Sequence, residues 1–559
     1  MKRFIIGVAI LAVVIGGAVA YKMLIPRTSG GGGPLAGITE SSGGLTYAKA
    51  TPLTAPPVGG FQLPTVDLGD GPVPLLTVPL DTWGGYAALF AANRGVSPSK
   101  DSLFYKKGHF AVQLVHVESS TDQLAGYSAG QYPLIWASMD SLPLLYDALK
   151  ADKRVAPKVL GLFDWSAGGD GILAKSWVKT PADLKGKIIL TSSNTPYAFF
   201  LLWYLAQNGL TGNDVKVVWD DDGAKALKLF KQDKRIAAWV SWTPYINDCL
   251  DPKSPSYVPD TRLMISSKDA NQLIADCYIV RADFLQEKPK MAQAFVEAMM
   301  EASQEISAKT YSDMAGFYKL ASAGDAKSML DDVHVANFPE NKMFFDEANT
   351  IGTYKIFILA QEYYKQLGVI PQGSTYEADQ VLAPQFLAAI DKEGLFKDQK
   401  NTMLNSFNTK SSLDLSDLES SKVVLTDNVE MYFDPNQSTF DINSDRAEFK
   451  QDMTLLDKVA EQTKFLSTTA IELVGNSDTS MQAAFKAKGP QGYADGAAQV
   501  TILSKHRAEF IRSLLIDHYG LPANRVLATG VGWDNPLDPN DQAKNRRVDV
   551  KFISLQQGN

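Results

Sequence analysis

Short apolar runs alternate with helical patterns from Val73 to about residue 300, and this alternation limits the fold more than any other feature of the chain. Short runs bounded by turn residues indicate strands, whereas a 3.6-residue apolar periodicity indicates helices. The expected strands are 74–80, 110–117, 132–137, 159–163, 172–174, 187–191, 215–219 and 236–240, and the expected helices are 85–93, 196–208 and 224–231. This order favours an α/β domain with mostly parallel sheets. Residues 281–400 have a mostly helical pattern.

The length of the chain predicts more than one domain. Single cores stop growing near ~250–300 residues, and this chain has 559 residues, of which 45% are hydrophobic. Two segments have the composition of linkers, namely the glycine- and proline-rich residues 26–73 and the serine-rich residues 406–421. We therefore expect folded domains at 74–405 and 422–555. The net charge of −8 is not that of a typical nucleic-acid binder, so no nucleic acid is expected as a partner.

The first 25 residues have the pattern of an export signal. Lys2 and Arg3 precede an uncharged run over residues 4–20, and Ala18-Val19-Ala20 resembles a signal-peptidase site. The apolar character continues to about residue 25, close to the ~20 residues that span a bilayer. We expect residues 1–25 to anchor the protein in the inner membrane, with cleavage after Ala20 and release into the periplasm as the alternative.

Cys249 and Cys277 are the two cysteines of the chain, too few for a cysteine-rich zinc module. In an oxidising compartment they could pair, and the alternative is two buried thiols. The sequence does not decide between these.

The C-terminal region has the order β-α-β-α-β-β over residues 422–555, which predicts a compact α/β sandwich. This region contains, in order, the motifs Phe433-Asp434, Gly475-Asn476-Ser477-Asp478, Leu503-Ser504-Lys505-His506-Arg507-Ala508, Gly530-Val531-Gly532 and Asn545-Arg546-Arg547-Val548. These motifs resemble the OmpA-like peptidoglycan-binding family.

This resemblance implies that Asp478 and Arg507 hold the diaminopimelate of the peptidoglycan stem peptide, with Arg547 and Asn476 in support. Diaminopimelate carries a free ammonium and a free carboxylate, so a carboxylate and a guanidinium can bind its two ends. Arg546 and Arg547 have a structural alternative, in which the pair braces the sheet edge against Asp445 or Asp549. Residues 479–501 predict a long loop that could cover the pocket.

Residues of about 74–300 contain, in order, the stretches Trp83-Gly84-Gly85-Tyr86, Trp136-Ala137-Ser138-Met139-Asp140, 164–172, 183–187, Thr195-Pro196 and Trp242-Thr243-Pro244-Tyr245. With these stretches the region resembles the periplasmic substrate-binding proteins of the nitrate, sulfonate and taurine class, which includes thiamine-precursor binders. The resemblance implies a two-lobed type II periplasmic-binding-protein fold that closes on a small solute.

Several of these stretches follow expected strands, and ligands of open α/β sheets bind beyond the carboxyl ends of the strands. Helices that begin after Trp83 and Thr195 would direct unpaired N–H groups at an anionic or zwitterionic solute. Gly168 to Gly171 suit a hinge between the lobes. The predicted solute-binding residues are Trp83, Gly84, Tyr86, Ser138, Asp140, Asp164, Gly169, Asp170, Thr195 and Trp242. For single members of this set, a place in the core or in a turn is the alternative.

Three functions follow from these features. The first is a solute-binding protein that is fastened to peptidoglycan and serves an ABC transporter permease. The second is a structural tether of the envelope, and the third is an enzyme related to pyrimidine-precursor synthases. Such an enzyme would use a histidine-rich, metal-assisted site, and the chain has five histidines, two of them in the C-terminal region. We therefore expect no catalysis, no metal and no cofactor.

Overall fold

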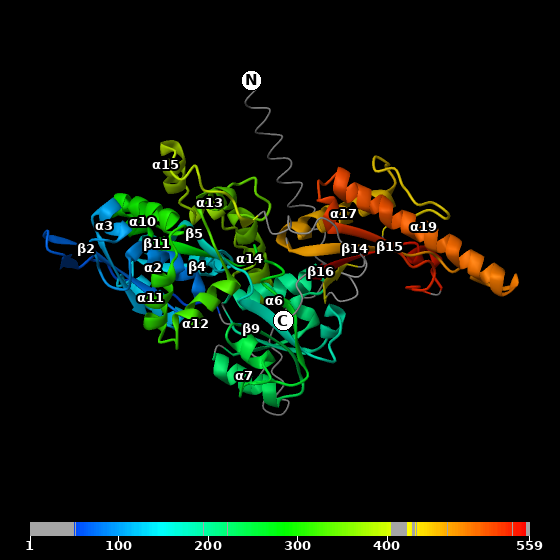
Figure 1. Ribbon diagram of the computed structural model, residues 1–559, viewed down its shortest axis with the longest axis horizontal. Helices are drawn as coiled ribbons and strands as arrows, with labels where there is room; N and C mark the ends of the chain where they lie inside the picture. The colour runs from blue at the N-terminus through cyan, green and yellow to red at the C-terminus, as the bar shows by residue number, and fades with distance from the viewer. Residues whose placement is uncertain are drawn as a thin grey trace, which may run out of the picture.

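The computed structural model describes residues 50–403 and 422–554, apart from 51, 194, 221, 428–430, 432, 467 and 539. The predicted membrane segment at 1–25 and the predicted linker at 406–421 lie outside the described residues. Three folded parts are visible in Figure 1: two lobes, and a C-terminal module beside them. Among the described helices, none combines the length and the apolar character needed to cross a membrane.

The first lobe, called lobe 1, contains residues 52–166 and 267–403. Its strands form two sheets, β1(Thr65–Asp67)-β2(Pro72–Leu80)-β3(Ala111–His116) and β12(Val333–Val335)-β5(Pro157–Ser166)-β11(Ala275–Arg281)-β4(Leu134–Ser138). Its α-helices are α2(Ala87–Asn93), α3(Leu103–Gly108), α4(Ser120–Ala129), α5(Leu142–Leu149), α9(Ala282–Glu287), α10(Pro289–Ala302), α11(Ala308–Tyr318), α12(Ala323–Ser328), α13(Phe338–Phe344), α14(Thr353–Leu367) and α15(Gln385–Glu393). Short 3-10 helices include η1(Gly84–Tyr86), η2(Met139–Ser141) and η6(Met329–Asp332).

The second lobe, lobe 2, contains residues 170–266. Its five-stranded sheet has the order β10(Thr261–Ser266)-β6(Asp170–Lys175)-β9(Ile236–Trp242)-β7(Ile188–Thr191)-β8(Lys216–Trp219). The helices α6(Pro196–Gln207), α7(Gly223–Gln232) and α8(Tyr245–Leu250) accompany it. Pro196 stands at the first position of α6, as its fixed φ and missing N–H favour. The sequence therefore predicted α6 to within one residue.

The chain crosses between the lobes twice, just after β5 and just before β11, and one serine ties the two crossings together. Ser267 Oγ lies 2.8 Å from Ser166 Oγ and accepts hydrogen bonds from the backbone N–H groups of Gly168, at 2.9 Å, and Asp170, at 3.1 Å. The glycine stretch predicted as a hinge therefore lies at a crossing.

The prediction of mostly parallel sheets is wrong for lobe 1. β11 runs antiparallel between β4 and β5, and β12 is antiparallel to β5. The prediction missed β10, β11 and β12. β11 is buried at every residue, so it lacks the apolar and polar alternation that would have indicated a strand.

The predicted linker at 26–73 does not hold for residues 52–73. β1 pairs with the beginning of β2, and the preceding residues pack on lobe 1. The buried Arg281 guanidinium donates to Gly59 O at 2.7 Å, and Phe61 packs against Phe284 with ring centroids 5.5 Å apart. Glycine and proline here allow an extended chain to follow the surface of lobe 1 rather than to leave it.

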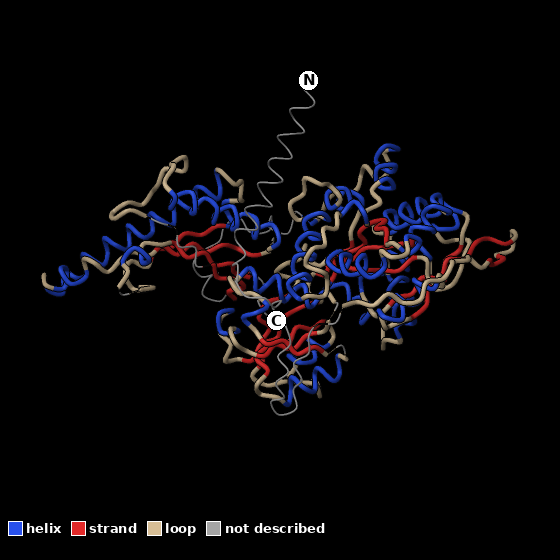
Figure 2. The backbone as a smooth tube through the Cα atoms, turned by 180° about the vertical axis from the view of Figure 1, so that it is seen from behind, coloured by secondary structure: helices blue, strands red, loops and turns tan. Residues whose placement is uncertain are grey.

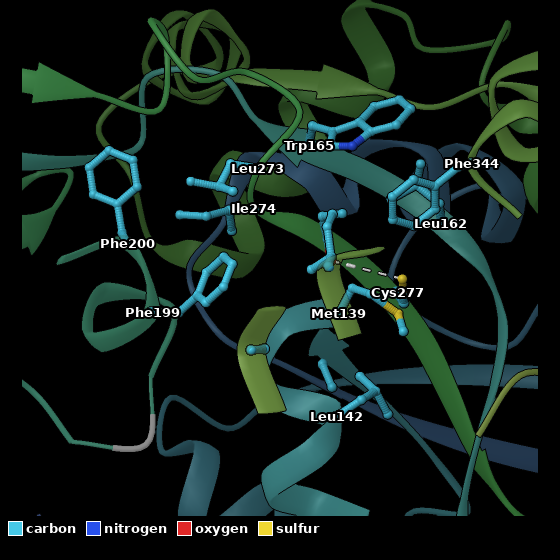
Figure 3. Packing of buried hydrophobic residues seen from close by; sticks show 14 of the residues in the cluster. Met139, Leu142, Leu162, Trp165, Phe199, Phe200, Leu273, Ile274, Cys277 and Phe344 are labelled. Carbon is cyan, nitrogen blue, oxygen red and sulfur yellow. Dashed lines mark hydrogen bonds between the residues drawn. The ribbon is translucent and has the colours of Figure 1, made fainter. Parts of the chain in front are cut away.

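The two cysteines lie in different cores and are free thiols. Cys249 packs in the core of lobe 2, in a cluster with Leu173 and Trp239. Cys277, on β11, belongs to the core cluster that also holds Met139 and Leu142 of lobe 1 (Figure 3). Burial raises the pKa of the Cys249 thiol to about 12. The structure thus answers the question that the sequence left open, in favour of two buried thiols.

The C-terminal module is called the wall module below, after the resemblance of its motifs to a peptidoglycan-binding family. Its sheet has the order β13(Lys422–Asp427)-β16(Val548–Ser554)-β14(Thr469–Gly475)-β15(Val526–Gly530). Its helices are α17(Ala447–Phe465), α18(Gln482–Lys486), α19(Gly489–Asp517) and α20(Gln542–Asn545). Apart from the short α18 and α20, this is the β-α-β-α-β-β order expected from the sequence.

The long loop predicted at 479–501 is wrong, because α18 and the first turns of α19 occupy it. Pro490 follows Gly489 at the start of α19, and the Phe485 ring packs directly on Gly496, which brings α18 against α19. Trp533 covers this contact by stacking on Tyr493, with centroids 5.6 Å apart. As a result α19 projects beyond the sheet of the module, which both views show (Figures 1 and 2).

The end of α17 joins the wall module to the body of the protein. Phe465 packs edge-on against Trp203 of lobe 2, with centroids 6.4 Å apart. Lys464 Nζ donates to Thr350 Oγ1 of lobe 1 at 2.8 Å, and Thr468 Oγ1 donates to Lys268 O at the second crossing, also at 2.8 Å. The module therefore contacts both lobes and a crossing between them.

Candidate functional site

A row of polar side chains lies at one end of the central strands of lobe 1. Asp276 on β11 is directly opposite Ser138 on β4 and Asp164 on β5. Residues directly opposite each other in antiparallel strands point to the same face of the sheet. The three side chains therefore form one row, at the carboxyl ends of β4 and β5, where the sequence placed the solute.

Asp164 is held by the segment that follows β2. Trp83 Nε1 donates to Asp164 Oδ2 at 3.1 Å. The carboxylate lies so close to Gly85 that a Cβ atom there would come within 1.4 Å of Asp164 Oδ2. Glycine is required at position 85 because a protein carboxylate fills the space at the beginning of this helical segment.

Asp140 and Asp170 extend the row on either side. Asp140 lies in η2, two residues after Ser138, and Tyr364 OH donates to its Oδ2 at 3.4 Å. Asp170 begins β6, at the first crossing. Burial raises the pKa of each of these two carboxyls to about 7. Both therefore titrate near neutral pH.

Asp276 lies at the centre of this set of carboxyls. Burial, and then the charges of Asp164, Asp170 and Asp140, raise the pKa of Asp276 well above its ordinary value. Burial likewise raises the pKa of Asp164, against the hydrogen bond from Trp83 that lowers it. Within the part of the chain that the structure describes, the atoms Oδ1 of Asp140, Asp164 and Asp276 accept no hydrogen bond.

Aromatic side chains from lobe 2 lie close to these carboxyls. Tyr197, at the start of α6, stacks on Trp242 with ring centroids 4.8 Å apart and an interplanar angle of 4°. Both rings are half-buried. Burial, and then the charges of Asp170, Asp81 and Asp276, raise the pKa of Tyr197, so its phenol lies within the field of the carboxyl row.

The structure brings most of the predicted solute-binding residues together. Trp83, Ser138, Asp140, Asp164, Asp170 and Trp242 line the region just described, and the Trp83 ring lies against the backbone of Gly169. Three others have different surroundings. Gly84 lies against the carbonyl of Met329, Tyr86 is fully buried with its hydroxyl on Asp81, and Thr195 Oγ1 donates to Ser192 O.

Sequence reasoning missed Asp276, Tyr197 and Asp81. Asp276 belongs to β11, which the apolar pattern did not predict, and only the pairing of β11 with β4 and β5 places it in the row. Tyr197 follows Pro196 in a stretch already singled out, so proximity to Thr195 was the available signal. Tyr86 OH donates to Asp81 Oδ1 at 2.7 Å, and burial raises the pKa of Asp81 to about 7.

A second candidate site lies in the wall module, where Asp478 follows the end of β14. Arg546 Nη1 lies 3.5 Å from Asp478 Oδ2, and the Asp478 side chain keeps 19% of its exposure. Ser480 N donates to Asp478 Oδ1 at 3.1 Å. The carboxylate is thus oriented by its own loop and remains reachable from solvent.

Arg507, on α19, is buried behind Asp478. Its Nε donates to Gln437 O and its Nη1 to Asn476 O, each at 2.9 Å, and its guanidinium lies 5.3 Å from the Phe433 ring centroid. Burial lowers the pKa of Arg507 to about 10, against the nearby charge of Asp478. Asp478 and Arg507 therefore lie in one site, with Arg507 locked in orientation by backbone carbonyls.

Arg547 and Asn476 surround a different carboxylate. Arg547 forms a bidentate ion pair with Asp549, in which Nε donates to Oδ1 at 2.7 Å and Nη2 donates to Oδ2 at 3.1 Å. Asn476 Nδ2 also donates to Asp549 Oδ2, at 3.0 Å. Of the two partners weighed for the arginine pair, Asp549 is therefore the one that Arg547 contacts. Arg546, which was not among the predicted binding residues, is the arginine next to Asp478.

Among the described residues, no group of three or more histidine, cysteine, aspartate or glutamate side chains is arranged to hold a metal ion. The ring nitrogen Nε2 of His334, in β12, lies 3.1 Å from Glu340 Oε1.

Two known families match different parts of the chain. Residues 101–309 match the family described as NMT1/THI5 like, and residues 432–549 match the OmpA family. The chain therefore joins an NMT1/THI5-like region in the two-lobed body to an OmpA-family region in the wall module. Both resemblances found in the sequence are confirmed.

Particular relatives match the same two regions. The chain is 30% identical to outer membrane protein A of Bordetella avium over 130 residues, which are 22% of this chain and 55% of the relative. It is 23% identical to the taurine-binding periplasmic protein of Escherichia coli (strain K12) over 207 residues, which are 36% of this chain and 60% of the relative. The chain thus spans between half and two thirds of the curated relatives it matches.

Two periplasmic binding proteins are among the solved structures that match this chain. One is the aliphatic sulphonate binding protein of Escherichia coli, at 17% identity and a TM-score of 0.43, covering 56% of this chain and 99% of that chain. The other is the nitrate-binding protein of Synechocystis, at 16% identity and a TM-score of 0.41, covering 59% of this chain and 91% of that chain.

Proposed function

We propose that this protein captures a small solute in the periplasm for an ABC-type transporter and is fastened to peptidoglycan by its wall module. The observation that carries the first half is the convergence of Trp83 and Asp164 from lobe 1 with Tyr197 and Trp242 from lobe 2, beside the crossings. Two lobes joined by short crossings can close on a ligand by rotation about a hinge. Capture, rather than catalysis, is the function that this arrangement supports.

The finer architecture belongs to the same proposal. We infer that the two lobes form a type II periplasmic-binding-protein fold, that residues 1–25 anchor the chain in the inner membrane, and that a permease in that membrane receives the solute. The similarity to a taurine-binding periplasmic protein supports the periplasm as the compartment and a small solute as the ligand.

In the wall module, Asp478 and the buried Arg507 are the proposed ligands of diaminopimelate, with Arg546 beside them. The stem peptide offers an ammonium to the carboxylate and a carboxylate to the guanidinium groups. Arg547 and Asn476 act behind this pair, because their contacts with Asp549 fix the ends of β14 and β16.

Thermal-shift measurement on the full chain tests solute capture. Sulfonates, nitrate, amino acids, amines and pyrimidines are added one at a time, since a ligand that binds the folded state stabilises it by RT ln(1 + [L]/Kd). At least one class should raise the melting temperature. A melting temperature that no class changes would favour the structural tether over the solute-binding protein.

Sedimentation with purified peptidoglycan tests the wall module. Asp478→Asn removes the charge and keeps the size of the side chain, and Arg546→Gln removes the charge and leaves a shorter polar side chain. Each should weaken binding about tenfold, the effect of losing one charge-assisted hydrogen bond of ~1.5 kcal/mol. Lys505→Gln, an exposed charge on α19, is the matched control and should bind as the unaltered protein does. Full binding by both site variants would refute the assignment of these residues.

A further inference from the structure

In the described part of the chain, the groups that act most strongly on the carboxyl row of lobe 1 include no basic side chain. Asp140 and Asp164 are fully buried, Asp276 is 5% exposed, and Asp170 is 6% exposed. Among the groups that act most strongly on the pKa values of Asp140, Asp164 and Asp276, none is a lysine, arginine or histidine. Buried carboxylates in proteins are normally paired, so this row is an exception that needs an explanation.

Hydrogen bonding leaves the same groups incomplete. One oxygen each of Asp140, Asp164 and Asp276 is buried and without a hydrogen-bond partner in the described chain. Because Asp276 lies directly opposite Asp164 in the β5–β11 ladder, these two carboxyls point to one face of the sheet. Several acceptor oxygens of the row therefore lie together at this end of the lobe 1 sheet.

The surroundings of the row suit a cation and not an anion. The beginning of the helical segment after Trp83, which could attract an anion, is already occupied by the Asp164 carboxylate. The Tyr197 and Trp242 rings lie near the row and are half-buried. Aromatic faces attract ammonium groups, most strongly when water is excluded.

We propose that the captured solute carries a protonated amine or a comparable organic cationic nitrogen, which the carboxyls of Asp164, Asp276 and Asp140 receive beside the Tyr197–Trp242 stack. This inference rests on the proposed function, since it names the chemical class of the solute. Of the anionic and zwitterionic solutes expected from the sequence, it selects those that also carry a positive nitrogen.

Two matched pairs of probes test the charge directly by titration calorimetry on the full chain. Taurine and isethionate differ in an ammonium against a hydroxyl, and 1,4-diaminobutane and 1,4-butanediol differ in the same way at both ends. In at least one pair, the amine should bind at least tenfold more tightly than its hydroxyl partner. Calcium chloride and ethanesulfonate serve as a metal cation and an amine-free anion.

Asp276→Asn gives the second measurement, because it keeps the shape of the side chain and removes the central charge. It should weaken binding of the preferred amine at least tenfold. The control is Asp152→Asn, an exposed carboxylate paired with Arg154 outside the row, and it should leave binding unchanged. Asp164→Asn is the second variant, in case Asp276→Asn fails to fold.

The outcomes separate the inference from the proposed function. If isethionate, ethanesulfonate or calcium binds as well as the amines, or if a folded Asp276→Asn or Asp164→Asn variant binds the amine as tightly as the unaltered protein, the cationic class is refuted and solute capture stands. If no probe binds and no solute of the wider thermal-shift set raises the melting temperature, solute capture itself is refuted.

Discussion

The carboxyl row should destabilise the folded protein at neutral and basic pH, and Asp140→Asn should relieve part of that cost. Burial raises the pKa of Asp140 to about 7 from an ordinary value of 3.8. A folded-state pKa above the unfolded one means that the folded state holds the proton more tightly. The carboxyl therefore has its full stabilising effect below pH 3.8, and this effect is lost as the pH rises to about 7.

The magnitude follows from the size of the shift. At about 1.4 kcal/mol per pKa unit, Asp140 costs about 4 kcal/mol of stability at pH 8 and about 2 kcal/mol at pH 5. An asparagine cannot ionise, and its amide can still accept from Tyr364. The groups that act on Asp140 are Ser138, Asp170 and Tyr364, and a nearby carboxylate makes a neutral residue at 140 more favourable still.

The assay is thermal unfolding of the ligand-free full chain at pH 5 and pH 8, with the unaltered protein and Asp140→Asn side by side. The variant should melt at a higher temperature at both pH values, and the gain should be larger at pH 8. Asp152→Asn controls for the change in net charge, because the pKa of Asp152 is lowered to about 2 and the residue is ionised throughout. An equal effect of Asp140→Asn at both pH values, or a loss of stability at pH 8, would refute the burial argument.

Two further predictions concern packing. Gly85→Ala should displace the Asp164 carboxylate, because the added Cβ would lie 1.4 Å from its Oδ2, and it should therefore weaken solute binding at least tenfold in titration calorimetry. Gly60→Ala is the control, because a Cβ there meets no atom within 4 Å. Unchanged affinity in Gly85→Ala would show that Asp164 does not contact the solute. Phe465→Ala removes a buried ring that packs on Trp203 and should lower the free energy of unfolding by about 3–5 kcal/mol. The loss should appear as faster proteolytic release of the wall module. A release rate like that of the unaltered chain would show that the ring stabilises the module alone.

The sequence predicted the elements whose pattern is local. α6 has its proline at the first helical position and a glycine, Gly209, just past its end. The strands β3, β7, β8 and β9 are short apolar runs between turn residues. For the same reason the predicted solute-binding residues fall largely in one place. Ser138 and Asp164 lie at the carboxyl ends of β4 and β5, which run in the same direction on either side of β11, so both side chains come to one end of that sheet.

What the sequence could not provide depends on contacts between distant segments. β11 returns through the middle of lobe 1 and is buried on both sides, so Asp276 is placed by its register with β4 and β5 and not by any local motif. In the same way, residues 52–73 have the composition of a linker, yet Arg281, more than 200 positions later, holds Gly59 on lobe 1. In residues 479–501, glycine and proline suggested a loop, but Phe485 and Trp533 stabilise helices there by packing on Tyr493 and Gly496.

The contacts at the end of α17 bear on how the two proposed activities are related. Two domains connected only by a flexible linker would move independently. Here Phe465 packs on lobe 2, Lys464 bonds to lobe 1, and Thr468 bonds to the backbone of the second crossing. Because a rotation between the lobes must change the distances among these three places, at least one of the contacts has to give way or follow when the lobes close. The proposed attachment to peptidoglycan and the proposed closure on a solute would therefore be mechanically connected through Lys464, Phe465 and Thr468. Phe465→Ala, which loosens this connection, is the variant in which the two activities should become independent.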